Sequence, residues 1–84
     1  MAEKKTILEG RYQDRAEASE YVNELTSLTW PQRQSVLLCL IGLLPANVKL
    51  EQRSALGPVD VTVDNFRFKI SQRAKVTQRY EVLP

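Results

Sequence analysis

The feature that most constrains the fold is an apolar run from Val36 to Leu44, interrupted only by Gly42 and ended by Pro45. A helix that is apolar on every side must be covered on every side. A chain of 84 residues has little surface to offer, because a domain of this size buries only about 60–65% of what its unfolded form exposes. We therefore expect the rest of the chain, or a second copy of it, to cover this helix.

Residues 29–32, which precede this run by a few positions, carry the signals of a helix start. Thr29 is a favourable N-cap residue, and Gln32 follows at the spacing of a capping box. Pro31 is tolerated in a first turn, where its missing N–H group has no partner to lose. The sequence predicts a helix that begins after Thr29 and ends before Pro45.

An earlier segment has the same kind of start. Asp14 and Glu17 stand at capping-box spacing, and apolar residues then recur along one side of a helix at Ala18, Tyr21, Val22, Leu25 and Leu28. The sequence predicts a helix over about residues 14–28.

After Pro45 the apolar period changes from about 3.6 to 2, as Val48 and Leu50 alternate with charged residues. Residues 59–63 and 66–70 then alternate on either side of Asp64-Asn65, two residues that tolerate a positive φ. A two-residue turn pairs Val63 with Phe66, Val61 with Phe68, Val59 with Ile70, Asp60 with Lys69 and Thr62 with Arg67. This register puts six apolar side chains on one face of a hairpin.

The two ends of the chain are less determined. Residues 1–5 resemble a flexible tail, and residues 6–13 fit a strand or a loop, since Gly10 weakens the strand pattern. Residues 75–83 fit a helix or a strand, and their β-branched and aromatic residues favour a strand at about 75–82. We expect a single small α+β domain over residues 1–84, with two N-terminal helices packed on one face of a three- or four-stranded, mainly antiparallel sheet.

The composition argues against catalysis. The chain has no His and a single Cys, so the commonest general base, an internal disulfide and a thiolate zinc site are all excluded. Gly10, Gly42 and Gly57 are isolated, and neither phosphate-binding glycine motif is present. We expect no enzyme activity, no cofactor and no metal.

Two further candidates for chemistry have simpler explanations. Cys39 lies among Leu38, Leu40 and Ile41, and a thiol in apolar surroundings is an inert core residue. Glu17, Glu20 and Glu24 lie at spacings typical of a solvated helix face, and as metal ligands they would be weak and unspecific.

Charge is distributed unevenly along the chain. Residues 1–30 carry four basic and six acidic groups, whereas residues 31–84 carry eight basic and four acidic groups. A basic cluster follows the hairpin turn and comprises Arg67, Lys69, Arg73, Lys75 and Arg79. A basic sheet face can bind a phosphate backbone, but Phe66, Phe68 and Tyr80 are expected to point inward, away from any bases. Nucleic-acid binding is therefore the second hypothesis.

The apolar helix carries the leading hypothesis, which is a non-catalytic accessory or regulatory module that acts through protein contact as a homodimer. Its expected partner interface comprises Trp30, Leu37, Leu40, Ile41 and Leu44. Two alternatives remain open: the helix is shared in an interface, or it is buried in the monomer between the first helix and the sheet. Trp30 is equally compatible with a partner anchor and with a residue tucked under the helix start.

The sequence also favours a cytoplasmic location. The first residues are polar and mixed in charge, without a signal-peptide pattern. The apolar run is shorter than the roughly 20 residues that span a bilayer.

Overall fold

The chain folds as an α+β protein with two helices and a five-stranded antiparallel sheet. The computed structural model describes residues 3–80. In chain order the elements are β1 (Lys5–Tyr12), α1 (Arg15–Val22), α2 (Trp30–Leu40), β2 (Ala46–Gln52), β3 (Val59–Val63), β4 (Phe66–Ile70) and β5 (Val76–Tyr80). The sheet order follows the chain order, so both helices lie in the connection between β1 and β2.

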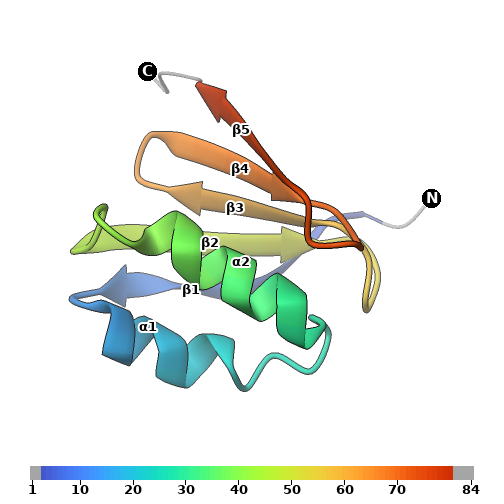
Figure 1. Cartoon of the computed structure of the whole chain (residues 1–84), viewed down its shortest axis with the longest axis horizontal. Helices are drawn as coiled ribbons and strands as arrows, with labels where there is room; N and C mark the ends of the chain where they lie inside the picture. The colour runs from blue at the N-terminus through green and yellow to red at the C-terminus, as the bar shows by residue number, and fades with distance from the viewer. Residues whose placement is uncertain (1–2, 81–84) are drawn as a thin grey trace.

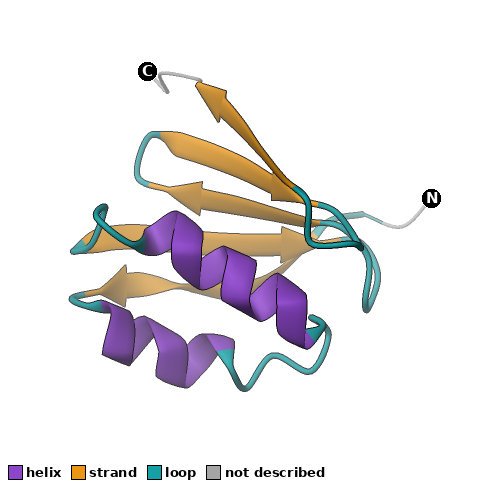
Figure 2. Ribbon diagram, in the orientation of Figure 1, coloured by secondary structure: helices purple, strands orange, loops and turns teal. Residues whose placement is uncertain are grey.

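Both helices lie on the same side of the sheet, with α2 across its middle and α1 near the β1 edge (Figure 1). Figure 2 shows the helices as one layer and the strands as another. The buried apolar residues are Tyr12, Ala18, Val22, Leu28, Val36, Leu37, Leu40, Ala46, Val48, Leu50, Val59, Val61, Val63, Phe68 and Ile70. They come from both helices and from alternate strand positions, so one core lies between the two layers.

The hairpin has the predicted register at all five pairs, from Val59 opposite Ile70 to Val63 opposite Phe66. Asp64 adopts a φ of 50° in the turn. Its carboxylate accepts a hydrogen bond from the Asn47 N–H at 3.0 Å, and its own N–H donates to the Asn47 carbonyl at 2.9 Å. The turn is therefore tied to β2 as well as closing β3 and β4.

The strand count was predicted too low: the sheet has five strands rather than three or four. The segment left open between strand and loop is β1, and Gly10 does not interrupt it. A Cβ atom at Gly10 would lie 3.2 Å from the Tyr12 hydroxyl, so the tyrosine ring covers the space beside the glycine. Lys5 is already the first residue of β1, so the strand begins within the segment expected to be a tail. At the other end β5 is a strand, as favoured, and residues 81 and 82 of the expected strand lie outside the described residues.

Helix α1 ends at Val22 and not at residue 28 as predicted. Beyond it the N–H groups of Glu24, Leu25 and Leu28 each donate to the carbonyl three residues earlier, which is the spacing of tighter turns. Asn, Thr and Ser residues are frequent in this stretch and compete with helical hydrogen bonds. Leu28 nevertheless reaches the core.

Helix α2 has the predicted capping box but ends at Leu40, four residues before the expected end. Gly42 adopts a φ of +82°, a conformation that glycine accepts without steric cost. The N–H of Leu43 then donates to the Leu40 carbonyl at 3.0 Å. The last part of the apolar run is thus a turn that leads into β2.

Two buried glutamines, Gln32 on α2 and Gln52 on β2, connect the start of α2 to neighbouring loops. Both side-chain amides donate to the Gly57 carbonyl at 3.0 Å. Gln32 also donates to the Ser71 carbonyl at 3.1 Å, and Gln52 to the Ser27 carbonyl at 3.0 Å. This glutamine pair gives buried backbone carbonyls their hydrogen-bond donors and so fixes the loops at this end of the molecule.

Candidate functional site

Helix α2 presents three large apolar side chains to solvent. Trp30 is 66% exposed, Leu38 63% and Ile41, which caps the helix, 47%. Leu38 and Ile41 follow Trp30 by eight and eleven residues, so at about 100° per residue all three lie on the same side of the helix, together with Gln34. We call Trp30, Leu38 and Ile41 the helix patch.

The structure divides the residues that were expected to form a partner interface. Trp30 and Ile41 belong to the helix patch, and Leu44 is half-buried. Leu37 and Leu40 are almost fully buried in the core of the single chain, so their side chains are not accessible to a partner. In the single chain, the side of the helix that carries these two residues packs into the core.

Leu38 was missed by the sequence analysis as an interface residue. The apolar run gives every side of the helix the same character, so its composition does not indicate which side faces the sheet. The spacing from Trp30 does not identify Leu38 either, because Leu37, seven residues after Trp30, lies closer to the line of Trp30 along the helix and is buried.

The helix patch carries no charge of its own. Arg33 is the single charged residue of α2, and its Nε donates to the Leu25 carbonyl at 3.1 Å. The Arg33 side chain is half-buried in that contact. The exposed side of α2 is therefore apolar, and Gln34, which lies beside the helix patch, is uncharged.

The basic residues lie elsewhere, around the sheet face that points away from the helices. Arg67 and Lys69 are exposed on β4, opposite Thr62 and Asp60 in the register. Arg73 and Lys75 are exposed in the connection from β4 to β5. The backbone of Arg79 pairs with Arg67 in the ladder, but its side chain lies outside the described part of the chain.

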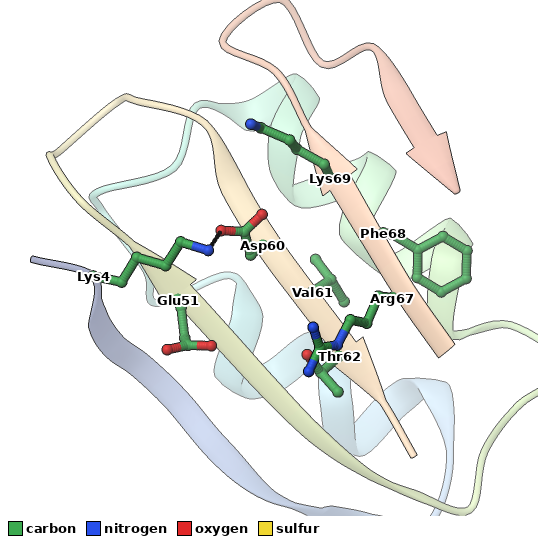
Figure 3. Close-up of a pocket in the computed structure, with 8 residues that line it drawn as sticks. All are labelled: Lys4, Glu51, Asp60, Val61, Thr62, Arg67, Phe68 and Lys69. Carbon is green, nitrogen blue, oxygen red and sulfur yellow. Dashed lines mark ion pairs between the residues drawn. The ribbon is translucent and has the colours of Figure 1, made fainter. Parts of the chain in front are cut away.

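A hollow on this outer face is lined by Lys4, Glu51, Asp60, Val61, Thr62, Arg67, Phe68 and Lys69 (Figure 3). Lys4 and Asp60 point toward each other and form an ion pair of 2.6 Å. A second hollow adds Arg53 and Pro58, and a third adds Ser71, Lys75 and Thr77. All three hollows share Lys69, so the fold brings Lys4 and Arg53, which the sequence analysis did not select, next to the basic cluster.

The expectation for the hairpin phenylalanines is confirmed. Phe68 is buried and Phe66 half-buried, at positions that alternate with the outward-facing Arg67 and Lys69. Neither phenylalanine of β4 therefore exposes its ring as Arg67 and Lys69 expose their side chains, although Phe68 is among the residues that line the hollow.

The remaining candidates carry little chemistry. Burial raises the pKa of the Cys39 thiol to about 11, so little of the reactive thiolate is present near neutral pH. The Glu17 carboxylate accepts a hydrogen bond from the Gln13 N–H at 3.1 Å, and Glu20 and Glu24 are exposed. Within the described residues, His, Cys, Asp and Glu side chains form no group of three or more that could hold a metal ion.

No helix within residues 3–80 has both the length and the apolar character needed to cross a membrane. Comparison with known proteins gave no match to a family model, to a curated protein or to a solved structure. The helix patch and the basic outer face of the sheet are therefore the two surfaces from which a function can be inferred.

Proposed function

We propose that this chain is a non-catalytic interaction module that forms a homodimer through the helix patch on α2. The observation that carries the proposal is the exposure of Trp30, Leu38 and Ile41 on one side of α2. Large apolar groups gathered on a surface are typical of interaction sites, and Trp is enriched among the residues that contribute most binding energy.

A second copy is the occupant that the charge distribution supports. In a twofold contact both copies use the same surface, so a surface whose charges are mostly of one sign brings like charges together. The acidic residues of α1 and the basic residues of the outer sheet face would repel their own copies. The helix patch has no charge, and two copies can pack α2 against α2 without that repulsion.

The limited size of the chain favours the same assembly. Small domains often complete their burial of apolar surface by oligomerisation. The proposal of a non-catalytic role is supported by the raised pKa of the Cys39 thiol and by the absence of His from the sequence.

The test is the molar mass in solution, measured by size exclusion with light scattering from low to high micromolar concentration. We expect twice the 9.6 kDa of one chain for the wild type, and a single chain for Leu38→Glu, because an unpaired carboxylate in a dimer contact is strongly unfavourable. Leu56→Glu is the matched control: Leu56 is 53% exposed in the loop before β3, and this variant should stay dimeric.

Trp30 is the only tryptophan of the chain and gives a second measurement. Its fluorescence emission should shift to longer wavelength when the wild type is diluted into the monomeric range, and Leu38→Glu should show the shifted emission at every concentration. A wild type that is monomeric at high micromolar concentration, or a folded Leu38→Glu variant that remains dimeric, would contradict the proposal.

A further inference from the structure

We infer that the outer sheet face around Lys69 binds the phosphate backbone of nucleic acid without reading its sequence. The site consists of the three connected hollows that share Lys69, and we call it the Lys69 surface. Its cations are Lys4, Arg53, Arg67, Lys69 and Lys75, and its carboxylates are Glu51 and Asp60.

The Lys69 surface carries more positive than negative charge. Five cations and two carboxylates line the described hollows, and the Asp60 carboxylate is engaged by Lys4. Even with Arg67 left out of the count, four cations and two carboxylates leave an excess of positive charge, and it is spread over a surface rather than aimed at one point. Repeated phosphates are the ligand that such a distribution fits.

Different parts of the fold converge on the Lys69 surface. Lys4 precedes β1, Arg53 follows β2, Lys69 is in β4 and Lys75 precedes β5. In Figure 3 Lys69 projects on the same side of the sheet as the ion pair between Lys4 and Asp60, whereas the Phe68 ring lies on the other side of the β4 ribbon. The basic character is thus produced by tertiary structure, although it was only partly visible in the run from Arg67 to Arg79.

The backbone around Lys75 is held in place. Its N–H donates to the Ser71 hydroxyl at 3.0 Å, and its carbonyl accepts from the Ser71 N–H at 2.9 Å. The loop before β3 is likewise held by the bonds from the glutamine pair to the Gly57 carbonyl. Hydrogen bonds therefore hold the backbone of Lys75 and the loop that follows Arg53.

The composition of the Lys69 surface favours nucleic acid over a protein or a membrane as its ligand. The core of a protein interface is apolar and depleted of charged residues, and membrane binding combines basic residues with exposed apolar side chains. Among the exposed lining residues of the Lys69 surface Pro58 is the one apolar side chain. A highly charged surface with little apolar area matches contacts to phosphates.

The position of the aromatic residues determines the type of recognition. Single-stranded nucleic acid is usually bound by stacking of bases on aromatic rings, but Phe66 and Phe68 project from the opposite face of β4. We therefore expect binding to be independent of sequence, and duplexes to bind at least as tightly as single strands, because phosphates are denser along a duplex.

The test is a titration of fluorescently labelled DNA duplex and single strand, followed by anisotropy at about 50 and 200 mM salt. The variant is Lys69→Gln combined with Lys75→Gln. The control is Arg11→Gln combined with Lys49→Gln, which removes the same charge from the far part of the same sheet face, where these side chains line a separate hollow. Circular dichroism establishes that each variant is folded.

We expect the Lys69 and Lys75 variant to bind duplex at least tenfold more weakly at the lower salt concentration, and the control to change less than threefold. Removal of two phosphate contacts should also reduce the slope of log affinity against log salt by about 1.8 for duplex. The inference is overturned if the wild type does not bind at low salt, or if both variants weaken equally. Tighter binding of vesicles that contain phosphatidylserine than of duplex would overturn it as well. The Leu38→Glu variant should still bind, so this result is independent of the dimer proposed above.

Discussion

The two helices begin with the same sequence motif, but the motif has different surroundings in the two cases. At α2 Thr29 accepts from the Gln32 N–H at 3.2 Å, and Gln32 accepts from the Thr29 N–H at 2.9 Å. At α1 Asp14 accepts from the Glu17 N–H at 2.9 Å, but Glu17 accepts from Gln13, one residue before the cap. The α1 start is exposed, whereas Gln32 is fully buried.

Burial changes the role of the last residue of the motif, which is Gln32 in α2 and Glu17 in α1. Gln32 has an amide nitrogen left over after capping, and it donates to the Gly57 and Ser71 carbonyls. A carboxylate has no donor to offer, so Glu17 serves only the chain beside it. A local motif thus becomes a long-range contact where the side chain is buried and retains a free donor.

The largest effect should come from Gln32→Glu. This variant keeps the acceptor for Thr29 but removes both donors and places a carboxylate against two carbonyl oxygens. We expect a loss of about 3 kcal/mol in the free energy of unfolding, because buried polar groups lose their partners and a charge is buried. Urea unfolding at a fixed protein concentration measures it, and the loss should be smaller at pH 4, where a protonated carboxyl group can donate.

Gln32→Leu is the companion variant for this prediction, since it removes the donors without adding a charge. It should be destabilised less than Gln32→Glu at pH 7 and should show no comparable recovery at pH 4. Equal stability of wild type and both variants would mean that the bonds to Gly57 and Ser71 do not stabilise the fold.

An intermediate effect is expected at the two N-caps. Thr29→Ala leaves a partly buried N–H without its acceptor, and we expect a loss of about 1.5 kcal/mol. Asp14→Ala exposes the corresponding N–H to water, and we expect about half of that loss. The same urea experiment compares them, and a larger loss for Asp14→Ala would reverse the comparison between the two helices.

The smallest effect should come from Glu17→Gln, which makes the α1 motif chemically like that of α2. The amide retains an acceptor for the Gln13 N–H and loses only a charge near the helix start, so the free energy of unfolding should change by less than about 0.5 kcal/mol. A loss comparable to that of Gln32→Glu would show that Glu17 has a structural role beyond its hydrogen bond to Gln13.

The predicted candidate sites depended on tertiary structure to different degrees. Arg67 and Lys69 were placed correctly on the outer face because their orientation follows from the hairpin register. Leu37 and Leu40 were assigned to an interface because an apolar run has no polar positions that would show which side of the helix packs against the sheet. Lys4 and Arg53 were missed because they are distant in sequence from the cluster they join.

Sequence alone was enough to predict the local elements, which are the two helix starts, the hairpin and its register, and the inward direction of its phenylalanines. Each of these depends on residues that are neighbours along the chain or across one tight turn. Four features became clear only from the folded structure. They are the presence of a fifth strand, the side of α2 that is buried, the long-range hydrogen bonds of Gln32 and the convergence of cations around Lys69. These depend on which distant segments cover a residue: the fold sets burial, and burial decides whether a side chain stabilises the core or remains available to a partner.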